Sequence, residues 1–203
     1  MPFTMTINES ASVLGLTFPT KTTVTADGNV SKAPTVAAAK TGTLTTRTDA
    51  NTGELTMAAS HGITTGARLD LYWSGGSRRG VVVGTVATNA VPIDLGAGDN
   101  LPTVSTAITA MVPTEEAFAV DGDTVSAIAL YSDQAGQIVF CLTDNTEVKA
   151  YSVGGAVGAT QSTFWTADRD ATNPLAGADI TKVYFSHGTS TASASMRAVV
   201  LNS

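Results

Sequence analysis

The sequence contains one cysteine and no long apolar run, and each absence excludes a class of protein. Cys141 is the only cysteine among 203 residues, so no disulfide can form within the chain, which excludes a small disulfide-bonded secreted scaffold. No window approaches the roughly 18 apolar residues of a membrane-spanning helix. The first residues, MPFTMTINESAS, have neither the basic nor the apolar segment of a secretion signal. We therefore predict no membrane partner and no signal peptide.

Charge is also scarce. Charged residues make up 14% of the chain, and 11 basic against 17 acidic residues give a net charge of −6. A protein that follows nucleic acid needs clustered Lys and Arg to neutralise phosphates, so we predict no nucleic-acid partner. Only Arg78 and Arg79 are adjacent basic residues. We interpret them as the polar start of a strand, with an anion site as the alternative.

Helical patterning is missing as well. Turn residues are dense and no segment sustains an apolar period of 3.6 residues, which predicts a very low helix content. The run from Val36 to Lys40 is the only one with helix propensity, and it is too short for a stable helix. Apolar residues make up 43% of the chain, enough for a substantial core beneath a surface of Thr, Ser, Asn and Gly.

The clearest local pattern is a β-hairpin between residues 60 and 87. Residues 68–73 alternate in polarity, as expected of a half-buried strand. Leu69, Leu71 and Trp73 share the apolar face, and Arg68, Asp70 and Tyr72 share the other. Residues 74–77 supply the turn. Residues 81–86 are apolar on both faces, so this second strand is expected to lie deeper in its sheet.

The whole chain is predicted to be all-β, with two small antiparallel β-barrel or sandwich modules and an extended N-terminal arm. Strand patterns separated by turn signals fill residues 41–113, the first module, and a boundary is expected at Pro113. Short polar turns join the strands of the second module, residues 114–203, which favours an antiparallel sandwich. A long connection over residues 154–179 interrupts it, with Trp165 as the expected anchor.

Residues 1–40 are predicted to be the arm and its linker. Residues 20–25 could pair with residues 30–36, and Pro34 would place the second segment at a sheet edge. Apolar residues spaced by polar ones suit addition to the sheet edge of a neighbouring subunit. The alternatives are that the segment supplies the first strand of its own module or is disordered. The candidate partner-binding residues are Phe3, Ile7, Val13, Leu14, Leu16 and Phe18.

No motif for catalysis stands out. A triad of His187, Asp179 and either Ser186 or Ser190 is possible on paper, but it lacks a nucleophile-elbow context. His61 and His187 fall in different modules, and no zinc motif is present. Cys141 lies in an apolar run, which is typical of a buried core thiol.

Binding motifs are equally weak. Asp168, Arg169, Asp170 and Asn173 place oxygen ligands in one loop that could hold Ca²⁺, although the order departs from an EF-hand and a solvated loop is the simpler interpretation. The glycine pairs are not followed by helices and so are not phosphate loops. The scattered aromatic residues leave sugar stacking as a minor alternative. We predict no catalytic residue, no metal site and no cofactor.

Residues 58–73, AASHGITTGARLDLYW, carry a resemblance to a known family. The run resembles a small β-module of tailed-phage virion proteins in which a His-Gly-apolar-x-Thr-Gly turn precedes a strand. The chain as a whole is similar in composition and layout to phage capsid decoration (cement) proteins. That resemblance implies a homo-oligomer, commonly a trimer, on the capsid surface. It covers a turn, so no binding residue is carried over from it.

The sequence thus leads to the expectation of a non-enzymatic phage virion structural protein, made in the host cytoplasm and located in the virion on the capsid surface. Its expected partner is the major capsid protein or another virion protein. The alternatives are a tail tube, fibre or baseplate component, a carbohydrate-binding β-module and, last, a hydrolase.

Overall fold

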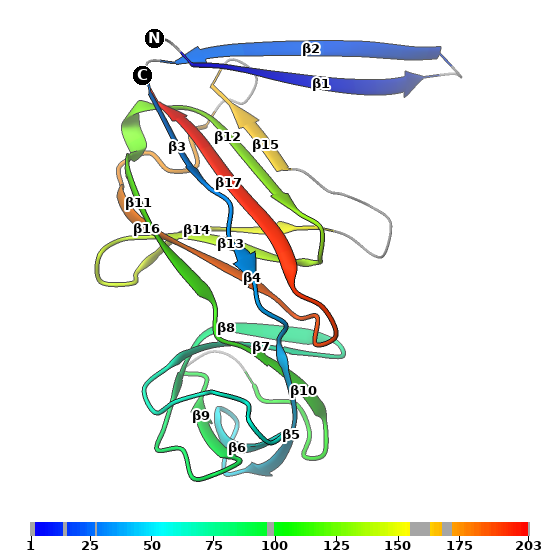
Figure 1. The fold of residues 1–203 in the computed structure, drawn as a ribbon, viewed down its shortest axis with the longest axis vertical. Helices are drawn as coiled ribbons and strands as arrows, with labels where there is room; N and C mark the ends of the chain where they lie inside the picture. Colours follow the sequence, from blue (N-terminus) through cyan, green and yellow to red (C-terminus); the bar gives the residue numbers. More distant parts are fainter. Residues whose placement is uncertain are drawn as a thin grey trace.

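The protein is all-β, as predicted. The computed structural model describes residues 3–13, 16–26, 28–96, 100–154, 163–167 and 172–202, with the backbone alone for residues 3–13, 16–26, 163 and 164. Strands hold 60% of the chain and helix 2%. Figure 1 shows a barrel at one end, a sandwich in the middle and a hairpin at the far end.

A closed six-stranded antiparallel barrel forms from residues 40–111, in the order β10-β5-β6-β9-β8-β7. Closure pairs both edges of every strand, so the barrel leaves no open sheet edge. Leu44, Leu55 and Leu69 are fully buried at its centre. Its strands are β5 (Lys40–Arg47), β6 (Thr52–Met57), β7 (Arg68–Trp73), β8 (Gly76–Val83), β9 (Ala90–Asp94) and β10 (Ala107–Met111).

The hairpin of β7 and β8 matches the predicted alternation on its first strand only. Leu69 and Leu71 are buried in the barrel, and Trp73 packs partly buried against the same cluster. The prediction that β8 lies deeper in its sheet than β7 is wrong, because Val82 on β8 is 62% exposed whereas Asp70 on β7 is 1% exposed. A barrel strand has only one inward face, so its outward residues meet solvent unless another module covers them.

The sandwich packs two antiparallel sheets, one in the order β11-β16-β13-β14 and the other in the order β15-β12-β17-β3. Phe118, Phe140 and Phe185 are fully buried between them. The rings of Phe118 and Phe140 pack edge to face, with their centroids 5.4 Å apart. The strands are β3 (Gly28–Lys32), β11 (Thr114–Asp121), β12 (Val125–Ser132), β13 (Gly136–Cys141), β14 (Glu147–Val153), β15 (Thr163–Thr166), β16 (Asp179–His187) and β17 (Ala194–Asn202). A single 3-10 turn, η1 (Gly122–Thr124), joins β11 to β12.

Residues 28–39 belong to the sandwich and not to an N-terminal arm or linker, which corrects the sequence interpretation. The strand β3 pairs with β17 along residues 28–32, and β4 (Thr35–Val36) pairs with the start of β17. Val36 and Ala39 lie in the sandwich core. The reason is non-local: β17 offers an open edge, and these residues can fill it. The predicted position of Pro34 at a sheet edge agrees with the place of β3 at the end of its sheet.

The long connection of the second module contains a strand of its own. The short strand β15 pairs with β12, with Trp165 opposite Ile128. Trp165 is 9% exposed and belongs to the sandwich core, as expected of an anchor.

The segment before β3 forms a separate hairpin of β1 (Phe3–Val13) and β2 (Leu16–Ala26). It pairs with itself, and not with residues 30–36 as the sequence had suggested. Among the described strands it joins no other sheet. In Figure 1 it lies across the end of the sandwich that is opposite the barrel.

Candidate functional site

The N-terminal hairpin carries most of the predicted partner-binding residues. Phe3, Ile7 and Val13 lie in β1, whereas Leu16 and Phe18 lie in β2. Leu14 falls outside the described residues. The structure therefore brings these predicted residues together in a two-stranded ribbon instead of a single extended strand.

The pairing register of the hairpin separates its residues by polarity. Residues that face one another in an antiparallel pair share a face, and alternate residues share it along each strand. The pairs Phe3↔Ala26, Met5↔Val24, Ile7↔Thr22, Glu9↔Thr20, Ala11↔Phe18 and Val13↔Leu16 define one face. The other face consists of Thr, Ser, Asn and Lys positions together with Pro19. One face of the hairpin is thus mostly apolar by register, with Glu9 as its single charged position.

The outer face of the β12–β17 sheet holds a second feature, a groove of about 580 Å³. Cross-strand pairs build its floor, since Ala129 faces Val199 and Tyr131 faces Arg197. Residues 33 and 34, which connect β3 to β4, and Thr35 at the start of β4 form one side. The lining is mainly apolar, and Arg197 is its only charged residue. Arg197 makes no hydrogen bond or ion pair with any residue that the structure describes.

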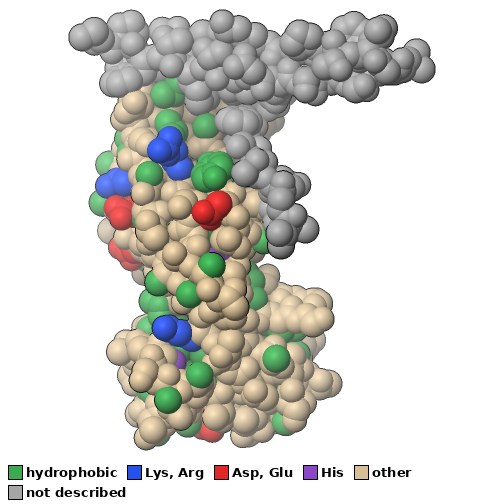
Figure 2. All heavy atoms as spheres, turned by 45° about the vertical axis from the view of Figure 1, so that its right-hand side comes forward, with side chains coloured by type: hydrophobic (Ala, Val, Ile, Leu, Met, Phe, Trp, Pro, Cys, Tyr) green, Lys and Arg blue, Asp and Glu red, His purple; other side chains and the backbone are tan. Residues whose placement is uncertain are grey.

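The described surface carries few charges. Figure 2 shows one face of the barrel and sandwich, on which Lys, Arg, Asp and Glu side chains are sparse. This agrees with a charged fraction of 14% in the sequence. Contacts made by such a surface depend on apolar area and backbone hydrogen bonds more than on ion pairs.

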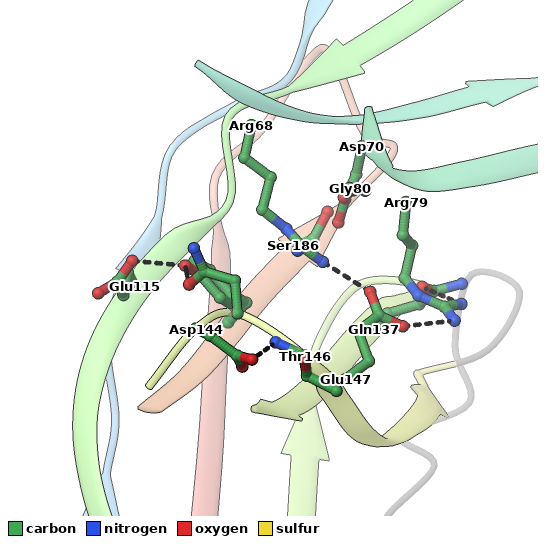
Figure 3. Close-up of polar contacts among 12 residues, drawn as sticks. Arg68, Asp70, Arg79, Gly80, Glu115, Gln137, Asp144, Thr146, Glu147 and Ser186 are labelled. Carbon is green, nitrogen blue, oxygen red and sulfur yellow. Dashed lines mark hydrogen bonds and ion pairs between the residues drawn. The ribbon is translucent and has the colours of Figure 1, made fainter. Parts of the chain in front are cut away.

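The junction between barrel and sandwich holds the densest polar network (Figure 3). Arg68 on β7 and Arg79 on β8 both donate to Glu147 on β14, with N···O distances of 2.6 and 3.1 Å. Arg79 also donates to Gln137 on β13, at 2.9 Å. The guanidinium carbon of Arg68 lies 4.7 Å from the ring centroid of Tyr184 on β16. The two arginines therefore attach the β7–β8 hairpin to three strands of the sandwich.

A buried carboxyl group forms the centre of this junction. Asp70 is 1% exposed, accepts a hydrogen bond from the Gly80 N–H at 2.9 Å, and contacts the Ser186 hydroxyl. The hydroxyls of Ser186 and Tyr72 lie 2.8 Å apart. Either hydroxyl of this pair can donate to the other, and the Asp70 carboxyl lies beside Ser186. Asp70 and Tyr72, which lie on one face of β7, thus both contact Ser186 of the sandwich.

Arg78 and Arg79 are both engaged inside the protein, which favours the structural interpretation of this pair. Arg78 donates through Nε and Nη2 to the Leu95 carbonyl, at 3.2 and 2.9 Å. A polar pocket of about 280 Å³ lies beside them, lined by Arg68, Ser77, Arg78, Arg79, Gly80 and Glu147. The contacts of Arg68 and Arg79 with Glu147 place a compensating negative charge in this pocket.

Both histidines stabilise turns. The Ile63 N–H donates to His61 Nδ1 at 3.0 Å, and the Thr189 N–H donates to His187 Nδ1 at 3.2 Å. Because Nδ1 accepts in each ring, Nε2 carries the proton, and it donates to the Thr88 carbonyl in the first case and to the Ala37 carbonyl in the second, both at 2.9 Å. The catalytic triad that the sequence allowed around His187 does not form. The ring nitrogens of His187 bind backbone groups, and Ser186 contacts Tyr72 and Asp70.

Cys141 is a buried thiol, as predicted. It is free and fully buried beside Val139 and Tyr184. Burial raises the pKa of this thiol to about 11, so it stays protonated near neutral pH. A protonated thiol is a poor nucleophile, which argues for a packing role.

Metal ligands do not converge in the part of the chain that the structure describes. No group of three or more His, Cys, Asp or Glu side chains with a metal-binding arrangement occurs there. Asp168, Arg169 and Asp170, the candidate Ca²⁺ loop, lie outside the described residues. Asn173 is described, and its amide binds the Gly122 carbonyl at 2.7 Å.

The junction network and the sheet groove were missed by sequence reasoning. The outward positions of β7, Arg68, Asp70 and Tyr72, gave a signal, because a strand face with two charged residues in a charge-poor chain is unusual. Their partners Glu147 and Ser186 lie far away in sequence, and no local pattern connects them.

Comparison of this chain with family models, with curated proteins and with solved structures finds no match. Within the described residues, no helix is long and apolar enough to cross a membrane. The fold and surface therefore define its class: an all-β protein with a barrel, a sandwich and an N-terminal hairpin.

Proposed function

We propose that the protein is a non-enzymatic structural protein of a tailed-phage virion, a capsid decoration or cement protein that binds the major capsid protein lattice. The observation that carries the proposal is the N-terminal hairpin, which has an apolar face by register and joins no other described sheet. A two-stranded hairpin alone is marginally stable in water, so such a face gains most from a protein partner.

The body of the protein supports a structural role. Its histidines bind backbone carbonyls, its cysteine is buried, and Arg68 and Arg79 join the two modules. These polar groups serve packing and module attachment, which suits a protein that works by adhering to other proteins. Location on the capsid surface and a trimeric state are part of the same proposal.

Co-sedimentation with purified capsids of the encoding virus tests the function. We expect the full chain to sediment with capsids, and the chain without residues 1–26 to remain folded but bind at least about tenfold more weakly, since burial of each large apolar side chain contributes about 1.5–3 kcal/mol. The truncation leaves β3 and the rest of the sandwich intact.

Matched point variants separate an effect of the apolar face from general disturbance of the hairpin. Ile7→Ser and Phe18→Ser change the apolar face, whereas Asn8→Ser and Lys21→Ser change the polar face. Weaker binding by the first pair alone supports the proposal. Equal binding by all four variants and by the truncated chain would contradict it.

Electron microscopy of the virion decides between capsid and tail. Antibody-bound gold on the capsid supports a decoration protein. Label confined to the tail would establish the alternative, a tail tube, fibre or baseplate component, and would overturn the capsid assignment.

A further inference from the structure

A cluster of polar side chains lies on one face of the β11-β16-β13-β14 sheet, beside the turn between β13 and β14. The register of the sheet places Glu115 of β11 directly opposite Tyr184 of β16. Lys182 lies two residues before Tyr184 and so shares its face of the strand, whereas Val183 between them belongs to the sandwich core. Asn145 lies in the turn that follows β13. The cluster is thus on the face of the sheet that is turned away from the core.

The other side chains of the cluster converge on the amide of Asn145. Lys182 Nζ donates to Asn145 Oδ1 at 2.8 Å, and the Tyr184 hydroxyl lies 2.7 Å from the same oxygen. Glu115 contacts both donors, with Oε2 2.6 Å from the Tyr184 hydroxyl and Oε1 3.6 Å from Lys182 Nζ. Because a carbonyl bond is about 1.2 Å long, Nζ lies no more than about 4 Å from the amide carbon of Asn145. An amine is therefore within reach of a carbonyl carbon, with a carboxylate beside the amine.

The turn fixes the position of the amide. Asn145 has a φ of 69°, in the left-handed region that asparagine tolerates better than most residues. Its N–H donates to the Leu142 carbonyl at 3.1 Å, and the Leu142 N–H donates to the Thr146 carbonyl at 3.0 Å. The Asp144 carboxylate accepts from the Thr146 N–H at 2.9 Å. Groups held at short distance react as if at very high concentration, so a slow reaction between two side chains becomes feasible.

We propose that Lys182 and Asn145 join in an intramolecular isopeptide bond, with Glu115 as the acid–base group. The Tyr184 hydroxyl binds the amide oxygen, where negative charge develops during attack. The modification goes beyond the proposed virion function and does not depend on it.

The reaction exchanges one amide for another, so it needs no oxidant, reductant or cofactor. The Glu115 carboxylate accepts one proton from the Lys182 ammonium, and the resulting amine attacks Cγ of Asn145. As the bond between Cγ and Nδ2 breaks, Glu115 returns the proton to Nδ2, which leaves as ammonia. The new amide nitrogen gives up its second proton, and the ammonia takes it up as ammonium, so atoms and charge balance. Asn145 is exposed, so ammonium leaves directly to solvent.

The hydrogen bonds of the cluster match the state in which attack takes place. Tyr184 is 5% exposed, and burial together with the hydrogen bond and charge of Glu115 raises the pKa of its hydroxyl, which therefore keeps its proton. Once Glu115 has accepted the proton of Lys182, it donates to Tyr184, and Tyr184 donates to Asn145. Both short contacts of Tyr184 are then satisfied.

The bond would tie the β13–β14 turn to β16 across 37 residues of chain. Such a cross-link restricts the unfolded chain in the same way as a disulfide. The chain has a single cysteine and so cannot form a disulfide within itself. An isopeptide bond is thus a covalent means of stabilisation that remains open to it.

Mass spectrometry of the intact, denatured full chain tests the inference. We expect the wild-type mass to be lower than the sequence mass by one ammonia. Lys182→Arg, which keeps a cation beside Glu115, and Asn145→Gly, which suits the positive φ, are expected to show the full sequence mass. Glu115→Gln is expected to form the bond about a hundredfold more slowly, since it cannot accept a proton. Lys149→Arg, on the neighbouring strand β14, is the control and is expected to lose ammonia as the wild type does.

Tandem mass spectrometry of a protease digest locates the bond. A branched peptide that joins Lys182 to Asn145 supports the inference. A cyclic imide formed by Asn145 with its own backbone also lacks one ammonia but does not need Lys182, so ammonia loss that persists in Lys182→Arg overturns the inference. A wild type that keeps its full mass after days of incubation overturns it as well. Formation of the bond at the wild-type rate in Glu115→Gln would overturn the role of Glu115.

Discussion

The pKa values of two carboxyl groups at the junction shift in opposite directions. Burial raises the pKa of Asp70, and the hydrogen bonds from Gly80 and Ser186 and the charges of the nearby arginines offset it only in part. Burial alone would also raise the pKa of Glu147, but hydrogen bonds and charges of Arg79 and Arg68 outweigh it and lower that pKa. Direct ion pairs with Arg68 and Arg79 thus favour the ionised form of Glu147. For Asp70 the effect of burial is larger than that of the same two arginines.

The lowered pKa of Glu147 predicts a pH-dependent contribution to stability. A depressed pKa stabilises the folded state above the unfolded pKa, and the stabilisation is lost as pH falls through the folded pKa. Glu147→Gln is therefore expected to reduce the free energy of unfolding by about 1–2 kcal/mol near neutral pH. The difference from wild type should shrink as pH falls below the ordinary range of a glutamate.

Urea unfolding at a series of pH values measures this effect. Glu54→Gln is the control, because Glu54 makes no ion pair with the residues that the structure describes. The contribution of Asp70 to stability changes with pH in the opposite direction. Its raised pKa favours the folded state at low pH, and this effect is lost as pH rises. A constant difference between wild type and Glu147→Gln across the pH range would show that the ion pairs with Arg68 and Arg79 contribute little.

At the scale of elements, the boundary between hairpin and body lies at β3. The strand β3 covers the edge of β17, and Val36 at the end of β4 is fully buried. The hairpin before it pairs only with itself among the described strands. Truncations on the two sides of β3 should therefore behave differently.

Removal of residues 1–26 is expected to leave the melting temperature of the body nearly unchanged. Removal of residues 1–36 deletes a strand of the sandwich, exposes the edge of β17 and removes the buried Val36, whose burial alone contributes about 1.5–3 kcal/mol. We expect the longer truncation to unfold the sandwich or to aggregate, which circular dichroism and thermal melting detect. Equal stability of the two truncated chains would mean that β3 contributes little to the sandwich.

At the scale of the whole molecule, barrel and sandwich are expected to unfold together because the junction joins them through buried polar contacts. Ser186 of the sandwich contacts Asp70 and Tyr72 of the barrel. Tyr72 also packs against the sandwich core, and Met111 of β10 belongs to that core. The two modules thus share both apolar and polar contacts.

Ser186→Ala is expected to destabilise the protein by about 1–3 kcal/mol, because it leaves the Tyr72 hydroxyl and the Asp70 carboxyl without their common partner. Scanning calorimetry should show a lower melting temperature and a broadened or divided transition. Ser152→Ala, at an exposed position of β14, is the control. A single, unshifted transition in Ser186→Ala would indicate that apolar packing alone couples the modules.

Local patterns in the sequence determined what each segment forms. Alternation placed Leu69 and Leu71 in a core, an apolar run placed Cys141 in another, and dense turns with no helical period predicted an all-β chain. These features depend on neighbours a few residues apart, where the two-residue period of a strand and the conformational needs of turns act directly.

Pairings between distant segments were decided only by the tertiary structure. The association of β3 with β17 joins residues near position 30 to residues near position 200, and Glu147 meets Arg68 from a separate module. The exposure of Val82, in a strand that the sequence placed deeper in the sheet than its neighbour, follows from which face of β8 the closed barrel turns inward. The residue types along a strand favour a sheet, but many partners satisfy the same pattern, so strand pairing and coverage of each face depend on packing of the whole chain.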